Sequence, residues 1–248
     1  IEFFSSERDS LNNTVARRLR QYKALREIDI PNNISFPLFY DPLPIGMKIP
    51  QGKDNFQFRG IKTLRPDNLE KCAFMTIPQL AYLIRTKQVS SEELTRMYLD
   101  RLKRYQNDLQ CVVTLTEELA IEQARKADLE ISNGKYLGLL HGIPWGAKDL
   151  LSVPNYKTTW GAVPFKDQII DEKGTVVKKL EEAGAVLVAK LTLGALAWGD
   201  VWFGGKTKNP WNLEQGSSGS SAGPGSATSA GLVGFSIGSE TWGSIVSP

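Results

Sequence analysis

The chain has 248 residues, which is enough for one large domain or two small ones. Its 41% hydrophobic and 23% charged residues are ordinary for a globular protein, and a net charge of +3 is too balanced to indicate a nucleic-acid-binding protein. Two cysteines and one histidine exclude a disulfide framework and a histidine-based metal site. No apolar run reaches membrane-spanning length, and a first residue that is not Met leaves the compartment open, export with a removed signal peptide included.

The N-terminal quarter is predicted to be an extension of the main body. Residues 5–28 are polar with spaced apolar positions, which predicts a surface amphipathic helix. Residues 30–58 hold five prolines and are expected to be extended and irregular: Pro31, Pro37, Pro42, Pro44 and Pro50. We therefore place an N-terminal extension at residues 1–70 and the main domain at residues 71–248.

Two capping boxes predict the first helices of the body. Thr76 with Gln79 begins a short helix that reaches Ile84, and Ser90 with Glu93 begins a second that reaches about Tyr105. In a capping box the side chains at the two positions satisfy each other's free backbone N–H groups, so the helix start is specified locally.

The middle of the chain has an α/β pattern. A short β-branched run at 111–115 predicts a buried strand, and a helix is expected from 117 to about 131. Residues 176–183 then predict a helix, Gly184 its C-terminal cap, and the apolar run 185–189 a buried strand. A helix, a glycine and an apolar strand in this order are typical of a sheet with crossover helices.

Residues 204–244 are rich in Gly, Ser, Ala and Thr, yet apolar residues recur among them, unlike in a flexible linker. Residues 216–223 are Gly-Ser-Ser-Gly-Ser-Ser-Ala-Gly, and residues 238–245 are Gly-Ser-Glu-Thr-Trp-Gly-Ser-Ile. No Gly-Lys-Ser/Thr follows the first stretch, so a phosphate loop is excluded. In the second stretch a serine follows a tight turn whose N–H groups are expected to converge on an anion.

A serine hydroxyl is barely ionised at neutral pH, so a nucleophilic serine needs a base. His141 is the single imidazole, and its place before Gly142-Ile143-Pro144 indicates a structural residue at a strand entrance. A buried lysine serves as a base when its ammonium form is destabilised. Lys148 lies in a stretch, 139–151, that is almost free of other charges, although taken alone a lysine is more often at the surface.

Together these segments resemble the amidase signature family. Asn209-Pro210-Trp211-Asn212, the Gly/Ser run and Gly-x-Glu-x-x-Gly-Ser-Ile occur in that family's order. Ser220 and Ser244 are 24 residues apart (244 − 220), the family's spacing of its bridging serine and its nucleophile. Lys148 lies in the Gly-Ile-Pro-x-x-x-Lys-Asp context of the family's lysine, and the resemblance covers roughly residues 75–248.

The resemblance implies a Ser–Ser–Lys triad. Ser244 is expected to attack an amide carbonyl, and Ser220, after a cis peptide bond, to relay its proton to neutral Lys148. The implied oxyanion donors are the backbone N–H groups of Thr241, Trp242 and Gly243, together with that of the nucleophile. The implied substrate-binding residues are Ser218, Gly219 and Trp242. No metal and no organic cofactor is implied.

The implied fold is α/β, a mixed twisted sheet flanked by helices. Because family members continue well beyond the nucleophile, the sheet is expected to be truncated at the C-terminus. Two residues depart from the family pattern: Trp242 stands where Gly is common, and Val246 stands where Arg is frequent. Since an oxyanion donor is a backbone group, Trp242 is expected to shape the pocket without removing the donor.

Three functions follow from the resemblance. The first is a stand-alone amidase that acts on a small-molecule amide, with neither nucleic acid nor membrane as a partner and with self-association left open. The second is the glutaminase-type A subunit of a tRNA-dependent amidotransferase, which stable co-purification with a second protein would favour. The third is a non-catalytic binding member of the fold. The presence of all three triad residues argues against the third.

Overall fold

The computed structural model describes residues 4–28, 43, 46–48, 52 and 61–248. The proline-rich segment expected to be extended, residues 30–58, lies almost entirely outside the described residues. The chain divides into two compact units, Ile1–Phe56 and Gln57–Pro248. The predicted boundary between residues 70 and 71 stays a prediction, and each unit is described by itself.

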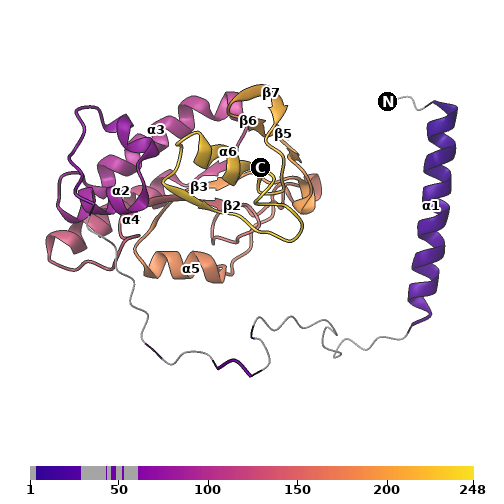
Figure 1. Cartoon of the computed structure of the whole chain (residues 1–248), viewed down its shortest axis with the longest axis horizontal. Helices are drawn as coiled ribbons and strands as arrows, with labels where there is room; N and C mark the ends of the chain where they lie inside the picture. The colour runs from indigo at the N-terminus through magenta and orange to yellow at the C-terminus, as the bar shows by residue number, and fades with distance from the viewer. Residues whose placement is uncertain (1–3, 29–42, 44–45, 49–51, 53–60) are drawn as a thin grey trace. The chain divides into compact units, whose positions relative to one another are not determined.

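The described part of the first unit is the helix α1, Ser5–Arg26, drawn in indigo in Figure 1. It forms where the amphipathic pattern predicts it. Its larger apolar side chains are at least half exposed: Leu11, Val15, Leu19, Tyr22 and Leu25.

A mixed sheet forms the centre of the second unit. Among the described residues it has four strands in the order β1-β3-β2-β8. Strand β1 is antiparallel to β3, whereas β2 is parallel both to β3 and to β8. The strands are β1 (Val112–Leu115), β2 (Pro144–Lys148), β3 (Val186–Leu191) and β8 (Phe235–Ile237). This confirms the predicted mixed α/β architecture.

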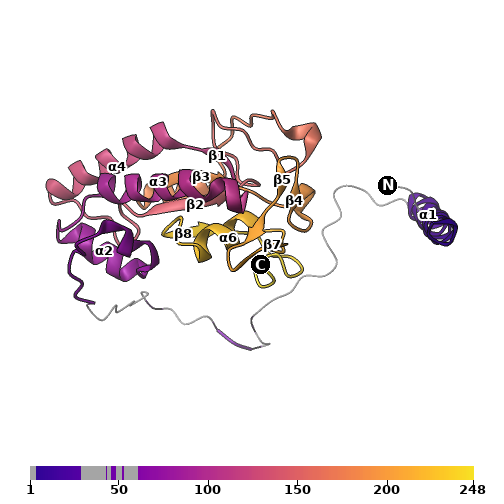
Figure 2. The ribbon, with the colours of Figure 1, turned by 90° about the horizontal axis from the view of Figure 1, so that it is seen from above.

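Helices cover both faces of this sheet, and Figure 1 shows α3 above it and α5 below it. Figure 2 shows α3 and α4 running alongside each other over the sheet. The helices are α2 (Ile77–Arg85), α3 (Ser91–Leu109), α4 (Glu117–Ser132), α5 (Thr175–Glu182) and α6 (Ala222–Ser229). Short 3-10 turns lie at Leu69–Phe74, Val163–Phe165 and Ala195–Ala197.

Local sequence signals explain the helix ends. Both predicted capping boxes form, with Thr76 and Gln79 before α2 and with Ser90 and Glu93 before α3. Helix α3 continues four residues beyond its predicted end at Tyr105. Helix α5 ends before Gly184, whose φ of +78° is rarely adopted by residues other than glycine.

Two small hairpins lie between β3 and α6. The first pairs β4 (Val201–Trp202) with β5 (Gly205–Lys206), and the second pairs β6 (Lys208–Asn209) with β7 (Asn212–Gly216). The Gly/Ser-rich region is thus ordered structure, as its apolar residues indicate.

The core is divided by the sheet. On one side Val186 and Val188 of β3 pack with apolar residues of α3, α4 and α6. On the other side Leu187 and Trp145 pack with Val177 of α5. All six residues of β3 are buried, which explains the apolar run over its first four residues, although the fifth, Lys190, is a buried lysine.

Candidate active site

Lys148 is the last residue of β2, a strand with a neighbour on each edge, and its side chain is only 1% exposed. Its Nζ lies 2.9 Å from the Oγ of Ser220, 2.9 Å from the Oγ of Ser221 and 2.8 Å from the Oγ of Ser239. All three of these hydrogen bonds join the amine to hydroxyls, which are neutral. The sheet thus presents a buried amine to three serines.

Burial lowers the pKa of Lys148 to about 8, and the negative charge of Glu240 opposes this effect. An ammonium group loses its hydration when it is buried, whereas a neutral amine loses much less, so burial favours the neutral form. A lysine with a pKa near 8 has an appreciable neutral fraction at physiological pH and is suited to accept a proton.

Ser220 connects the lysine to the predicted nucleophile. The peptide bond between Gly219 and Ser220 is cis, as the resemblance implies. The Oγ of Ser220 lies 3.1 Å from the Oγ of Ser244 and 2.9 Å from Lys148 Nζ. Hydroxyl protons rotate, so with a neutral lysine the same contacts let Ser244 donate to Ser220 and Ser220 donate to Lys148.

Close backbone packing fixes the position of Ser220. A Cβ added to Gly219 would lie 1.9 Å from the carbonyl oxygen of Gly199. The backbone at Gly199 can therefore contact the segment that carries Ser220 only because residue 219 is glycine. The N–H of Ser221 also donates to the carbonyl of Ser244, at 3.0 Å. The Gly/Ser run therefore places its serines through main-chain contacts.

Glu240 organises the turn that carries Ser244. Its carboxylate accepts hydrogen bonds from the N–H groups of Gly243, of Ile245 at 2.6 Å and of Val246 at 3.3 Å. These donors, Ile245 first, lower the pKa of Glu240. Gly243, with a φ of +95°, has its N–H engaged by Glu240 in this structure. The oxyanion roles of Thr241, Trp242 and Gly243 stay predictions.

A cavity lies beside the predicted nucleophile. Ser220, Ser239 and Ser244 line it, together with Gly219, Thr241 and two tryptophans, Trp198 and Trp242. The tryptophan rings have centroids 6.1 Å apart and are 72% and 84% exposed. Of the predicted substrate-binding residues, Gly219 and Trp242 line this cavity. Ser218 does not line it, and its hydroxyl contacts that of Ser247 at 2.8 Å.

The structure adds a contact that sequence reasoning misses. Ser239, five residues before the predicted nucleophile, makes the shortest of the three contacts to Lys148. A serine before a turn carries no distinct signal of its own in the sequence. Only the fold places it against a strand residue that lies 91 residues earlier.

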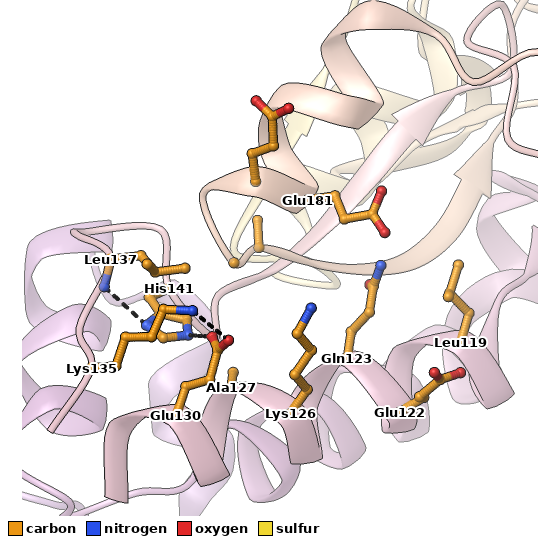
Figure 3. Close-up of a pocket in the computed structure, with 13 residues that line it drawn as sticks. Leu119, Glu122, Gln123, Lys126, Ala127, Glu130, Lys135, Leu137, His141 and Glu181 are labelled. Atoms are coloured by element: carbon orange, nitrogen blue, oxygen red, sulfur yellow. Dashed lines mark hydrogen bonds and ion pairs between the residues drawn. The ribbon is translucent and has the colours of Figure 1, made fainter. Parts of the chain in front are cut away.

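His141 lies in a different cavity, between α4 and the end of α5 (Figure 3). Its Nδ1 accepts a hydrogen bond from the N–H of Leu137 at 3.1 Å, and its Nε2 lies 3.1 Å from Glu130. Lys135 also pairs with Glu130, at 2.8 Å. Burial lowers the pKa of His141, which favours the neutral imidazole. These contacts support a structural role that ties α4 to the entrance of β2.

Comparisons with known proteins identify the family of this chain. A family model described as Amidase matches residues 93–248. The A subunit of glutamyl-tRNA(Gln) amidotransferase from Moorella thermoacetica is 37% identical over 178 residues, which cover 71% of this chain and 37% of that protein. The native peptide amidase of Stenotrophomonas maltophilia superposes with a TM-score of 0.67 at 30% identity, covering 71% of this chain and 38% of that one.

Fatty acid amide hydrolase is a further structural neighbour, with a TM-score of 0.66 and 28% identity over 71% of this chain and 32% of that protein. The chain therefore belongs to the amidase family, whose model matches more than half of its residues. It spans between 32% and 38% of the length of these three relatives.

Among the described residues, none of the helices combines the length and apolar content that crossing a membrane requires.

Proposed function

We propose that this chain carries the catalytic site of an amidase that cleaves a carboxamide C–N bond through an acyl-enzyme. The observation that carries the proposal is the continuous path from Lys148 Nζ to Ser220 Oγ, 2.9 Å, and from there to Ser244 Oγ, 3.1 Å. A buried amine, a relay hydroxyl and a second hydroxyl at the wall of a cavity supply the base, the proton path and the nucleophile.

In the proposed first half-reaction, Ser244 Oγ forms a bond to the carbonyl carbon as its proton moves through Ser220 to Lys148. The carbonyl electrons move onto the oxygen, and those backbone N–H groups of the turn at 241–244 that Glu240 does not engage hold the resulting oxyanion. As the carbonyl re-forms, the C–N bond breaks and the leaving nitrogen takes the proton back from Lys148 through Ser220. The products are an acyl-Ser244 ester and a free amine or ammonia.

Water completes the cycle. It attacks the ester carbonyl while Ser220 and Lys148 take its proton, and the proton then returns to Ser244 Oγ as the acid leaves. Ser220 and Lys148 serve both half-reactions, because in each one they accept a proton through the same two hydrogen bonds and then return it.

The test is labelling of the full-length protein with a fluorophosphonate, which reacts with activated serines. Wild type should label on the peptide that contains Ser244, and Ser244→Ala and Lys148→Met should each lose the label. Ser229→Ala is the matched control, because that hydroxyl bonds within its own helix, to Gly225 O at 2.6 Å. Labelling that survives Ser244→Ala would contradict the proposal and favour a binding-only member of the fold.

A second candidate is the glutaminase-type A subunit of a tRNA-dependent amidotransferase. The observation that favours it is the 37% identity to the A subunit of a glutamyl-tRNA(Gln) amidotransferase. The same serine chemistry would then release ammonia from the side-chain amide of glutamine and deliver it to a partner protein.

One comparison separates the two candidates. Glutamine hydrolysis is measured for the full-length protein beside a panel of uncharged acyl amides. A preference for the uncharged amides, with the protein purifying alone, supports the stand-alone amidase. Glutamine hydrolysis that rises when a co-purifying protein is present supports the amidotransferase.

A further inference from the structure

Two lysines are buried on neighbouring strands, and they differ in the partners of their amines. Lys148 on β2 meets three hydroxyls, as described above. Lys190 on β3 is 0% exposed and lies 2.5 Å from Oδ1 of Asp149, whose side chain is also fully buried. The parallel register pairs Ala147 with Lys190 and Lys148 with Leu191, so the two lysines are one register position apart on neighbouring strands and their side chains point to opposite faces of the sheet.

Asp149 directly follows the proposed base yet is turned away from it. Its Oδ2 accepts hydrogen bonds from the N–H of Thr159, at 2.8 Å, and from the Thr159 hydroxyl. Successive side chains of an extended strand point to opposite faces, which explains why Asp149 and Lys148 have separate partners. Lys190 completes its own shell with the carbonyl of Lys157 at 2.8 Å and the hydroxyl of Thr158 at 3.2 Å.

We propose that Lys190 is a positioning residue of this active site: it neutralises Asp149, so that Lys148 has no uncompensated carboxylate beside it and can act as a neutral base. The inference rests on the proposed function. A buried carboxylate without a partner would favour the ammonium form of any amine close to it, because low-dielectric surroundings screen the attraction poorly.

Glu240 is the charged group that acts directly on Lys148, whereas the Asp149–Lys190 pair adjoins Lys148 along the chain and across the strands but lies on the other face of the sheet. Asp149 directly follows the strand of Lys148, Lys190 lies on β3, and Glu240 lies on the turn after β8. Glu240 is exposed to solvent, so water screens it. The charge of Asp149 is buried, and Lys190 is the cation that compensates it.

The experiment measures the rate of fluorophosphonate labelling of the full-length protein against pH, which needs no knowledge of the substrate. The wild-type rate should rise with pH as Lys148 loses its proton. Lys190→Met should move the half-maximal pH up by about one unit. The double variant Lys190→Met with Asp149→Asn removes both charges and should return the midpoint to that of wild type. Lys190→Arg keeps the charge and should also keep the wild-type midpoint.

Lys179→Met is the matched control, because Lys179 pairs with Glu182 on the surface, 73% exposed. It should leave the midpoint unchanged. Should Lys190→Met fail to fold, Asp149→Asn carries the test: it leaves the Lys190 charge uncompensated and should move the midpoint to lower pH.

The outcomes separate this inference from the proposed function. Labelling that survives Ser244→Ala overturns both. Labelling that requires Ser244 and Lys148, but keeps one midpoint in Lys190→Met and Asp149→Asn, overturns only the role of Lys190. A uniform loss of rate at every pH, which the double variant does not restore, shows a purely structural ion pair and likewise overturns it.

Discussion

The hydroxyl of Ser220 lies 3.1 Å from that of Ser244, although 24 residues separate them in the chain. Ser220 is also 2.9 Å from Lys148, which lies 72 residues earlier. The sheet fixes the lysine, and main-chain contacts fix the serines. Substitutions at this site are therefore expected to change chemistry without disturbing the fold, and the predictions below use that separation.

Replacing the base tests the lysine directly. We expect Lys148→Met to lower the rate of amide hydrolysis by at least about 100-fold, because a positioned base contributes that much or more. Lys148→Arg should be equally inactive, since a guanidinium does not give up its proton near neutral pH. Thermal melting should show both variants folded. An activity close to that of wild type in either variant would exclude Lys148 as the base.

The pH profile of the wild type should follow the lysine. Its pKa is lowered to about 8, and the neutral form is the active one, so the rate should rise with pH and reach half its maximum near pH 8. At pH 7 about a tenth of the enzyme should be in the active form. A profile that stays flat through neutral and mildly alkaline pH would contradict this assignment.

Removing the charge of Glu240 should shift the pH–rate profile to lower pH, whereas Lys190→Met is expected to shift it to higher pH. Glu240 raises the pKa of Lys148, so Glu240→Gln should lower the pKa below 8 and shift the half-maximal pH downward. The maximal rate should also fall, because the carboxylate organises the turn by accepting from Ile245 and Val246. Glu214→Gln, on the exposed strand β7, is the control.

The two tryptophans over the cavity should contribute to substrate binding. We expect Trp242→Ala and Trp198→Ala each to raise KM about 5–10-fold for an apolar amide, with a smaller effect on kcat, because the rings cover the same cavity. Trp211→Ala is the matched control, since that ring is 78% exposed, lies in the β6–β7 hairpin and does not line the cavity. Equal KM values in the three variants would place substrate elsewhere.

Arg101 should be important for stability rather than for catalysis. It is 8% exposed, donates to Gly231 O at 2.8 Å and to Ala230 O at 3.0 Å, and so holds the end of α6 against α3. Arg101→Met should lower the free energy of unfolding by about 2–3 kcal/mol, because two buried carbonyls lose their donor. Arg96→Met breaks only an exposed ion pair with Glu92 and should lower the free energy of unfolding by less than about 0.5 kcal/mol. Urea titration of both variants measures the difference.

Features specified by neighbouring residues can be predicted from the sequence. The capping boxes at Thr76 and Ser90 are local, and so is the stop at Gly184, since each depends on residues within one helical turn. The apolar run of β3 is recognisable because both faces of that strand are covered. The predicted end of α3 is too early, because propensity near Tyr105 does not reveal how far packing against the sheet extends a helix.

Contacts between distant strands cannot be predicted in this way. The resemblance supplies Lys148, Ser220 and Ser244, and the structure brings them together, while their catalytic roles stay proposals. The pairing of Lys190 with Asp149 depends on the register between β2 and β3, and no spacing in the sequence encodes that register. A sequence in which Asp149 adjoins Lys148 favours a local pair, whereas its ionic partner lies on the neighbouring strand.

Strand β2 is closed on its second edge by β8, which begins 87 residues (235 − 148) after the lysine. Parallel strands need a long crossover, so this edge can pair only after the chain as far as β8 has been synthesised. On the proposed mechanism, a nascent chain leaving the ribosome has no reactive serine until β8 docks. The proposed site is therefore assembled late in synthesis, once both the lysine strand and the serine turn have been made.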